Sequence, residues 1–190
     1  MVPILTRDNL LIIGALLLIT FLAIRVFNGL IQARARTREA WAGIAVQLKR
    51  RTDLVPNLVS AVKGYAAHEL QLLDEVAQRR AEVERATGPA TAGQADLALG
   101  AALGRLLAVA ENYPNLKASD NFLELQQNLA DVEEKIAYAR RFYNRSAQEY
   151  NTRIQSVPAL IVARLCRFRS VEYFQAEATD RKTVRVSSTH

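Results

Sequence analysis

An unbroken apolar run near the start of the chain constrains its fold more than any other feature. Residues 10–24, LLIIGALLLITFLAI, are nonpolar apart from Thr20, and beyond Arg25 the run resumes as VFNGLI up to residue 31. A helix needs about 20 residues to cross the hydrocarbon of a bilayer, and a helix over 10–31 would be roughly 33 Å long. The sequence therefore predicts a short N-terminal segment (1–9), a transmembrane anchor (10–31) and a soluble part that begins at residue 32.

A cleaved signal peptide is the alternative for this run. Ala33-Arg34-Ala35 fits the A-x-A pattern of a cleavage site. However, the triplet lies well past the apolar run and contains an arginine, and the segment before the run carries only one cation, offset by an aspartate. The pattern favours the anchor.

The charges on the two sides of the run predict its direction. The charge before the run is nearly balanced, whereas four arginines follow it: Arg25, Arg34, Arg36 and Arg38. The positive-inside rule places the C-terminal side in the cytoplasm and the N-terminus outside. Arg34, Arg36 and Arg38 are also candidate contacts for anionic lipid headgroups at the membrane surface.

The soluble part reads as helices, since no segment of any length alternates apolar and polar residues as a strand would. The clearest helix is predicted between Asn121 and Gln155, and it would be roughly 50 Å long. Its apolar residues follow the three-four spacing of a coiled-coil seam, which other helices must cover. They are Phe122, Leu125, Leu129, Val132, Ile136, Ala139, Tyr143 and Tyr150, with Ala147 and Ile154 beside the line.

Shorter helices are predicted around this one. A second apolar stripe runs from Val55 to Val83, a loop is expected over 88–93, and an alanine- and leucine-rich helix over 95–111. Tyr113-Pro114-Asn115 ends that helix, and Pro158 marks a bend before residues 160–165. The polar tail, 175–190, is expected to be extended or loose.

Two Tyr–Asn pairs stand out on the long helix. Tyr143-Asn144 and Tyr150-Asn151 lie seven residues apart, so both tyrosines point along the same helix face. A buried tyrosine hydroxyl needs a hydrogen-bond partner, and an asparagine can cap or bridge neighbouring helices. The pairs favour a role in fixing helix register over a role as a ligand site.

The stretch QLKRRTDLVPNLV, residues 47–59, places three consecutive cations ahead of a proline. Lys49, Arg50 and Arg51 are predicted to end one helix, where cations complement the carbonyl end of the helix dipole. Asp53 would cap the next helix, with Pro56 in its first turn. The stretch is interpreted as a helix-to-helix corner, and contact of the three cations with lipid headgroups at the membrane surface is the alternative.

Motifs of catalysis are missing from the sequence. Its histidines are His68 and His190, neither follows a glutamate by three residues, and no HExxH, paired CxxC, phosphate loop or GxGxxG is present. Cys166, the single cysteine, has no obvious histidine partner, and a buried or lipid-facing thiol is expected. We expect no metal, no cofactor and no enzyme activity.

The charge distribution separates two classes of partner. A net charge of +6 would suit nucleic acid or an anionic membrane surface. Past Leu54 the cations and acids are interspersed, and no basic stripe with interleaved aromatic residues emerges. The excess charge gathers near the membrane exit and in the tail, which favours the lipid bilayer as a partner and argues against nucleic acid.

Three segments, in this order, resemble the signature segments of the LemA family: AWAGIAVQLKRRTDLVPNLVSAVKGYAAHE, AENYPNLKASDNFLELQQNL and ARRFYNRSAQEYN. The resemblance implies an all-α protein with an N-terminal transmembrane helix followed by an elongated antiparallel four-helix bundle, here residues 32–174. It also implies the bacterial cell (inner) membrane, a single pass and the N-terminus outside. Ala45 replaces an acid usual in the family, Val157 replaces a phenylalanine, and the tail KTVRVSSTH differs. The family brings no agreed reaction.

These features favour a membrane-anchored cytoplasmic helical-bundle protein that acts as an interaction or scaffold module for an unidentified protein partner. Two alternatives stay open. One is a membrane-associated enzyme or metal-binding accessory whose site no motif reveals, and the other is a self-assembling structural protein of the membrane surface. Because confinement to a membrane raises the effective concentration of identical chains, we expect a homo-oligomer.

Overall fold

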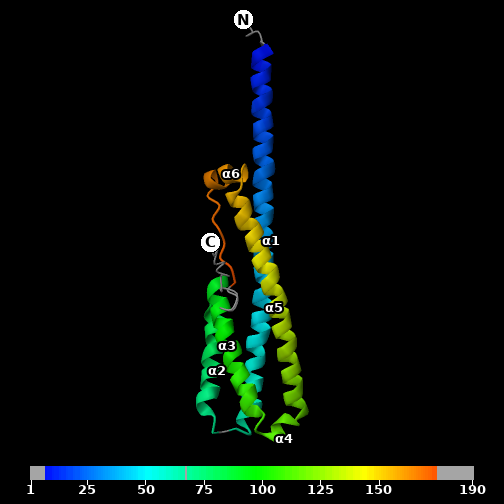
Figure 1. The fold of residues 1–190 in the computed structure, drawn as a ribbon, viewed down its shortest axis with the longest axis vertical. Coiled ribbons are helices and arrows are strands. Elements are labelled where there is room, and N and C mark those ends of the chain that lie inside the picture. The colour runs from blue at the N-terminus through cyan, green and yellow to red at the C-terminus, as the bar shows by residue number, and fades with distance from the viewer. Residues whose placement is uncertain (1–6, 67, 175–190) are drawn as a thin grey trace, which may run out of the picture. The chain divides into compact units, whose positions relative to one another are not determined.

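The computed structural model describes residues 7–66 and 68–174, and every helix or strand assigned in them is a helix (Figure 1). The elements are α1 (Arg7–Lys63), α2 (Leu70–Arg85), α3 (Pro89–Ala110), α4 (Pro114–Lys117), α5 (Asp120–Gln155) and α6 (Ala159–Leu165). The all-α prediction is confirmed for this part of the chain. The predicted loose tail, 175–190, lies outside the described residues.

The chain divides into two compact units, and each contains part of α1 and part of α5. Among the described residues, unit 1 combines residues 7–39 with 145–171, and unit 2 combines residues 40–66 and 68–144 with 172–174. Each unit has buried apolar residues of its own.

The N-terminal part of α1 is apolar and exposed. Its most apolar stretch of 18 residues has a mean hydropathy of 2.7, and none of that stretch is buried. The large apolar side chains from Leu10 to Ile24 are 45–67% exposed. By length and composition α1 is therefore able to cross a membrane, as the sequence predicted.

The apolar run of α1 leads into the core of unit 1. Leu30, inside the predicted anchor, is 1% exposed, whereas its neighbour Ile31 is 44% exposed. The core joins α1 to α5 and α6, and its buried members are Leu30, Ala33, Tyr150, Ile154 and Ala163. The predicted anchor, 10–31, thus overlaps residues that pack against protein.

A Tyr–Asn pair of α5 holds the segment that follows α6 in unit 1. The Tyr150 hydroxyl donates to the Arg169 carbonyl over 2.9 Å. The Asn151 side chain donates to the Val171 carbonyl and accepts from the Val171 N–H, both over 2.9 Å. The asparagine therefore satisfies both main-chain polar groups of a single residue.

The second Tyr–Asn pair repeats this pattern in unit 2. The Tyr143 hydroxyl donates to the Glu172 carbonyl over 2.6 Å. Asn144 donates to the Phe174 carbonyl over 3.0 Å and accepts from the Phe174 N–H over 2.9 Å. Both pairs fix the register of a non-helical segment against α5, rather than that of a neighbouring helix.

The apolar seam of α5 matches the sequence prediction. The helix runs from Asp120 to Gln155, within a residue of the expected bounds. The seam side chains are buried, except for Ala139, which is partly buried. Ala147 and Ile154, expected beside the line, are buried as well. The three-four periodicity therefore identified the face that α5 packs against its neighbours.

Unit 2 buries faces of α1, α2, α3 and α5. The connection between α2 and α3 is shorter than the loop predicted over 88–93, because α3 already begins at Pro89. Proline is tolerated in the first turn of a helix, where its N–H is not needed. Gly88 just before it has φ +92°, a backbone conformation that favours glycine.

The helix-to-helix corner predicted over 47–59 is wrong, because α1 continues through this stretch. Pro56 lies inside the helix and has no N–H to give to the Thr52 carbonyl four residues earlier. Arg80 of α2 supplies the missing donor, since its Nε donates to the Thr52 carbonyl over 2.9 Å. A hydrogen bond from another helix thus satisfies the carbonyl that Pro56 leaves without a donor, and α1 continues beyond this proline.

Candidate functional site

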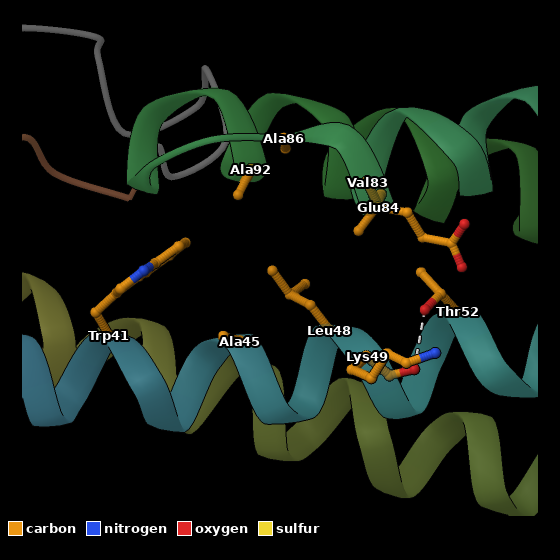
Figure 2. A pocket seen from close by; sticks show the side chains of 9 residues that line it. All are labelled: Trp41, Ala45, Leu48, Lys49, Thr52, Val83, Glu84, Ala86 and Ala92. Atoms are coloured by element: carbon orange, nitrogen blue, oxygen red, sulfur yellow. Dashed lines mark hydrogen bonds between the residues drawn. The ribbon is translucent and has the colours of Figure 1, made fainter.

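A cavity of about 410 Å³ lies in unit 2 between α1 and the α2–α3 hairpin (Figure 2). We call it the Trp41 groove. Its lining is mainly apolar, with one cation and one anion among the side chains. The lining residues are Trp41, Ala45, Leu48, Lys49 and Thr52 of α1, Val83 and Glu84 of α2, Ala86, and Ala92 of α3.

Trp41 belongs to an aromatic cluster beside this groove. Its ring centroid lies 5.8 Å from that of Tyr143 at an interplanar angle of 61°, and 6.4 Å from that of Phe174. Edge-to-face contacts of this kind are favourable for aromatic rings. Figure 2 shows the indole extending from α1 toward the hairpin. A large, partly exposed aromatic side chain fixed by its neighbours is the kind of residue that anchors protein contacts.

An ion-pair network centred on the buried Arg51 lies elsewhere in unit 2 and joins three helices, with Glu133 at its exposed end. The side chain of Arg51 is only 5% exposed, and its Nη1 donates to Asp96 Oδ1 of α3 over 2.7 Å. Its Nη2 pairs with Glu133 Oε2 of α5 over 2.6 Å. Gly100 leaves room for this guanidinium, because a Cβ at that position would lie 3.2 Å from Arg51 Nη2.

The electrostatics of this network are those of a buried pair. Burial raises the pKa of the Asp96 carboxyl, and the charge of Arg51 opposes that rise. Arg51 Nε and Gln47 Oε1 are buried and have no hydrogen-bond partner among residues 7–66 and 68–174. These two atoms belong to residues one helical turn apart on α1, a spacing that places them on the same face.

The six residues predicted to lie at the membrane surface divide into three groups. Arg34, Arg36 and Arg38 are exposed on the part of α1 that belongs to unit 1. Lys49 and Arg50 are exposed in unit 2, where Lys49 pairs with Asp53. Arg51 is buried against two carboxylates, so the expectation of a headgroup contact does not fit its placement. Asp53, expected to cap a helix, is instead an exposed partner of Lys49.

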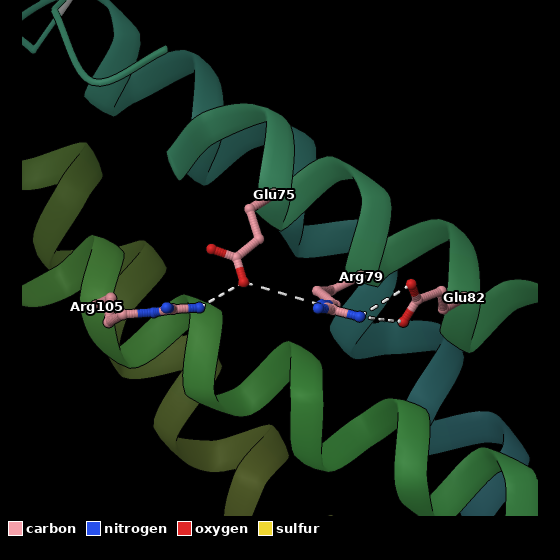
Figure 3. A network of polar contacts seen from close by, with 4 residues as sticks. All are labelled: Glu75, Arg79, Glu82 and Arg105. Carbon is pink, nitrogen blue, oxygen red and sulfur yellow. Dashed lines mark hydrogen bonds and ion pairs between the residues drawn. The ribbon is translucent and has the colours of Figure 1, made fainter. Parts of the chain in front are cut away.

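A network of exposed charges bridges the outer faces of α2 and α3 (Figure 3). Arg105 Nη2 of α3 pairs with Glu75 Oε1 of α2 over 2.5 Å. Glu75 also lies 3.9 Å from Arg79 Nε, and Arg79 Nη1 contacts Glu82 at 3.0 Å. Ion pairs at an exposed surface are typically worth no more than about 1 kcal/mol. This network supports the hairpin.

The side chains that could bind a metal or act as nucleophiles are not clustered in the part of the chain that the structure describes. Among residues 7–66 and 68–174, no group of three or more His, Cys, Asp and Glu side chains is placed to hold a metal ion. His68 is exposed, as expected for a surface position. Cys166 is a free thiol exposed at the end of α6, rather than a buried one.

Sequence reasoning missed the Trp41 groove and the partners of Arg51. Asp96 carried a usable signal, because it is the sole acid of the apolar helix α3. An isolated acid on such a helix calls for a cation on a neighbouring helix. The groove had no comparable signal, since α1 and the hairpin come together only in the folded chain.

Comparison with known proteins places this architecture. The model of the LemA family matches residues 40–187. The chain is 28% identical to Magnetosome protein MamQ of Magnetospirillum gryphiswaldense, a match that covers 87% of this chain and 71% of that protein. It is 27% identical to Magnetosome protein MamQ 1 of Paramagnetospirillum magneticum, with the same coverage, and 26% identical to Protein LemA of Metamycoplasma hominis over 84% of this chain and 74% of that protein. Because the family model covers most of its length, the chain belongs to the LemA family.

Proposed function

We propose that this chain is a single-pass protein of the bacterial cell membrane that acts as an interaction or scaffold module rather than as an enzyme. Its helical part would form an antiparallel four-helix bundle from the C-terminal part of α1, α2, α3 and the N-terminal part of α5. Bonds of Arg51, Arg80 and Arg105 to other helices within unit 2 support this arrangement.

One observation supports anchoring above all others. The exposed apolar stretch and the buried positions Leu30 and Ala33 belong to the same helix, α1. Cleavage after Ala35, as a signal peptide would require, would remove both residues from the core of unit 1. An uncleaved anchor keeps this core intact. We place the end of the anchor before Leu30, at about Phe27.

The proposed orientation places the helical part in the cytoplasm. Arg34, Arg36 and Arg38 are exposed just past the end of the apolar stretch, where they are free to interact with anionic headgroups. This part of α1 contains fewer acids than arginines, and Glu39 is the acid that directly follows the three arginines.

The Trp41 groove is the proposed contact for a protein partner. Its apolar lining and partly exposed indole suit an apolar side chain of a partner segment, and Lys49 and Glu84 offer charges of both signs. The names of the MamQ relatives mention the magnetosome and no reaction. A scaffold function is consistent with such names.

Photo-crosslinking in living cells tests this function. A photoreactive benzoylphenylalanine replaces Ala45, which is exposed and lines the groove. The matched control carries it at Tyr138, an exposed aromatic position on α5. We expect a defined adduct with a second protein from position 45 and none from position 138. An adduct of two copies of this chain would support the self-assembling alternative, and equal yields from both positions would contradict the groove.

A further inference from the structure

The short helix α6 carries an exposed apolar face. Val157, just before it, and Ile161 and Leu165 within it are 77%, 66% and 83% exposed. Their spacing of four residues places Ile161 and Leu165 on one side of the helix. Ala163, on another side, is buried in the core of unit 1. Exposure of three large apolar side chains to water costs free energy. This indicates that the face has an apolar environment in the cell.

This face belongs to the same unit as the apolar stretch of α1. The ring of Phe168 lies edge-on to that of Phe27 of α1, with centroids 5.9 Å apart. Ala159 and Val162 of α6 pack on the core that contains Leu30. Within unit 1, α6 therefore lies beside the turn of α1 where the exposed apolar stretch ends (Figure 1).

A cavity of about 370 Å³ separates the start of α6 from this turn of α1. Two arginines line it from the two sides, Arg25 on α1 and Arg153 on α5. Thr152 and Ser156 also line it, although the Ser156 hydroxyl donates to the Thr152 carbonyl. Arg153 also pairs with Glu149 over 2.8 Å, so its charge is partly balanced, and Arg25 adds a second cation beside the apolar face. A cation next to an apolar face is the combination that a phospholipid, with its phosphate and acyl chains, requires.

The charge around α6 has one sign. Residues 156–171 contain Arg164, Arg167 and Arg169 and no acid, and all three side chains are exposed. Cations on the polar side of a short apolar helix are typical of helices that lie at the surface of an anionic membrane. A protein partner would require acidic side chains placed opposite these arginines, whereas an anionic leaflet presents negatively charged phosphates over its whole surface.

We propose that α6 is an interfacial helix that inserts Val157, Ile161 and Leu165 into the lipid leaflet from which α1 emerges. Arg164 and Arg167 then contact lipid phosphates. α6 packs beside the end of the apolar stretch of α1, which the proposed anchoring exposes to lipid, and this proximity together with the arginines favours lipid as the occupant of the face. The proposal rests on the proposed anchoring by α1. It predicts that the protein meets the membrane at two elements rather than one.

Fluorescence quenching by lipids in the full-length protein tests the proposal. In a Cys166→Ser background, single cysteines at Ile161 or Leu165 carry an environment-sensitive label in vesicles of phosphatidylethanolamine and phosphatidylglycerol. We expect blue-shifted emission and strong quenching by lipids that bear a nitroxide near the headgroup. A label at Gln148, exposed on α5 in the same unit, should stay in water.

A label at Leu18 separates this proposal from the proposed anchoring. Deep quenching at Leu18 together with water-exposed labels on α6 would overturn the interfacial helix and leave the anchor standing. A water-exposed label at Leu18 would overturn the anchor itself. A blue shift on α6 that lipid nitroxides do not quench, and that disappears on dilution of the protein, would assign the face to a second copy of the chain.

A second measurement uses the native Cys166 as the labelled site. Ile161→Ser with Leu165→Ser should move a label on Cys166 into water, with loss of most of its quenching. Leu123→Ser, an exposed apolar position on α5, is the matched control and should change nothing. Circular dichroism verifies that the variants fold. Unchanged quenching in the double variant would contradict insertion of this face.

Discussion

Arg80 of α2 donates its Nε–H to the main-chain carbonyl of Thr52 in α1, over 2.9 Å. This carbonyl is the one that Pro56 leaves without an intrahelical donor. The contact stabilises the helix where a break is expected from its local sequence. The continuity of α1 in unit 2 is thus a tertiary effect.

Arg80→Met should therefore lower the free energy of unfolding by about 1–3 kcal/mol, because it leaves a partly buried carbonyl unsatisfied. In a Pro56→Ala background the new N–H of residue 56 can bond to Thr52, so the same change should cost clearly less. Urea unfolding of the full-length protein in mild detergent, followed by circular dichroism, measures both. Glu84→Gln removes only the ion pair of Arg80 with Glu84 and is the control. Equal costs of Arg80→Met in both backgrounds would disprove the coupling.

Arg50 and Arg51 are neighbours in sequence and opposite in environment. Arg51→Met should cost about 3–5 kcal/mol at neutral pH, because it strands the buried carboxylate of Asp96. Arg50→Met changes an exposed side chain and should cost at most about 0.5 kcal/mol. Thermal unfolding of the two variants decides between this view and a role of both arginines at the membrane surface, in which their stabilities would be alike.

The cost of Arg51→Met should depend on pH. Burial raises the pKa of Asp96 in the folded protein, and the loss of Arg51 removes an opposing influence. The folded state then holds this proton more tightly than the unfolded state does, so stability is lost as pH rises through the folded pKa and regained as pH falls below it. The variant should recover stability toward acid pH relative to the unmutated protein. A cost that is constant with pH would contradict the burial of Asp96.

Tyr143 should ionise at a higher pH than an ordinary tyrosine, whose pKa is about 10. Burial, with a smaller contribution from the charge of Glu172, raises the pKa of the Tyr143 hydroxyl to about 12. Absorbance titration of the phenolate, compared with that of Tyr143→Phe, isolates this group. Tyr138→Phe, at an exposed position, controls for the loss of one tyrosine and should leave the ionisation of Tyr143 in place. Since the folded pKa is the higher one, stability from Tyr143 is lost as pH rises above about 10.

Cys166 reports the orientation of the helical part. Because its thiol is exposed on the protein, a membrane-impermeant thiol reagent should label it once mild detergent has replaced the lipid, without unfolding. In intact cells, and after permeabilisation of an outer membrane alone, we expect no labelling. The single cysteine makes the assay specific, and Cys166→Ser gives its background. Labelling in intact cells would reverse the proposed topology.

The sequence was most informative where structure depends on local periodicity. The seam of α5 from Phe122 to Ile154 was predictable because three-four spacing reports the buried face of any helix. Lys49, Arg50 and Arg51 were not separable in the same way. Successive residues of a helix point about 100° apart, so a continuous α1 directs only one of these three cations inward. The continuity of α1 itself depends on Arg80, which lies 28 residues beyond Thr52 in the sequence.

Asn144 and Asn151 bind only main-chain atoms of Phe174 and Val171. These bonds therefore do not depend on the side chains of the exposed residues Glu172 and Tyr173, whereas Phe174 is 2% exposed and is constrained by its own packing. Its length is not free. Seven residues of helix and three residues of extended chain both cover about 10 Å, so one spacing fits the other. Insertion or deletion of a single residue between Val171 and Phe174 would move one of the two bound residues away from its asparagine, whereas substitution of the exposed Glu172 or Tyr173 would leave both sets of bonds in place.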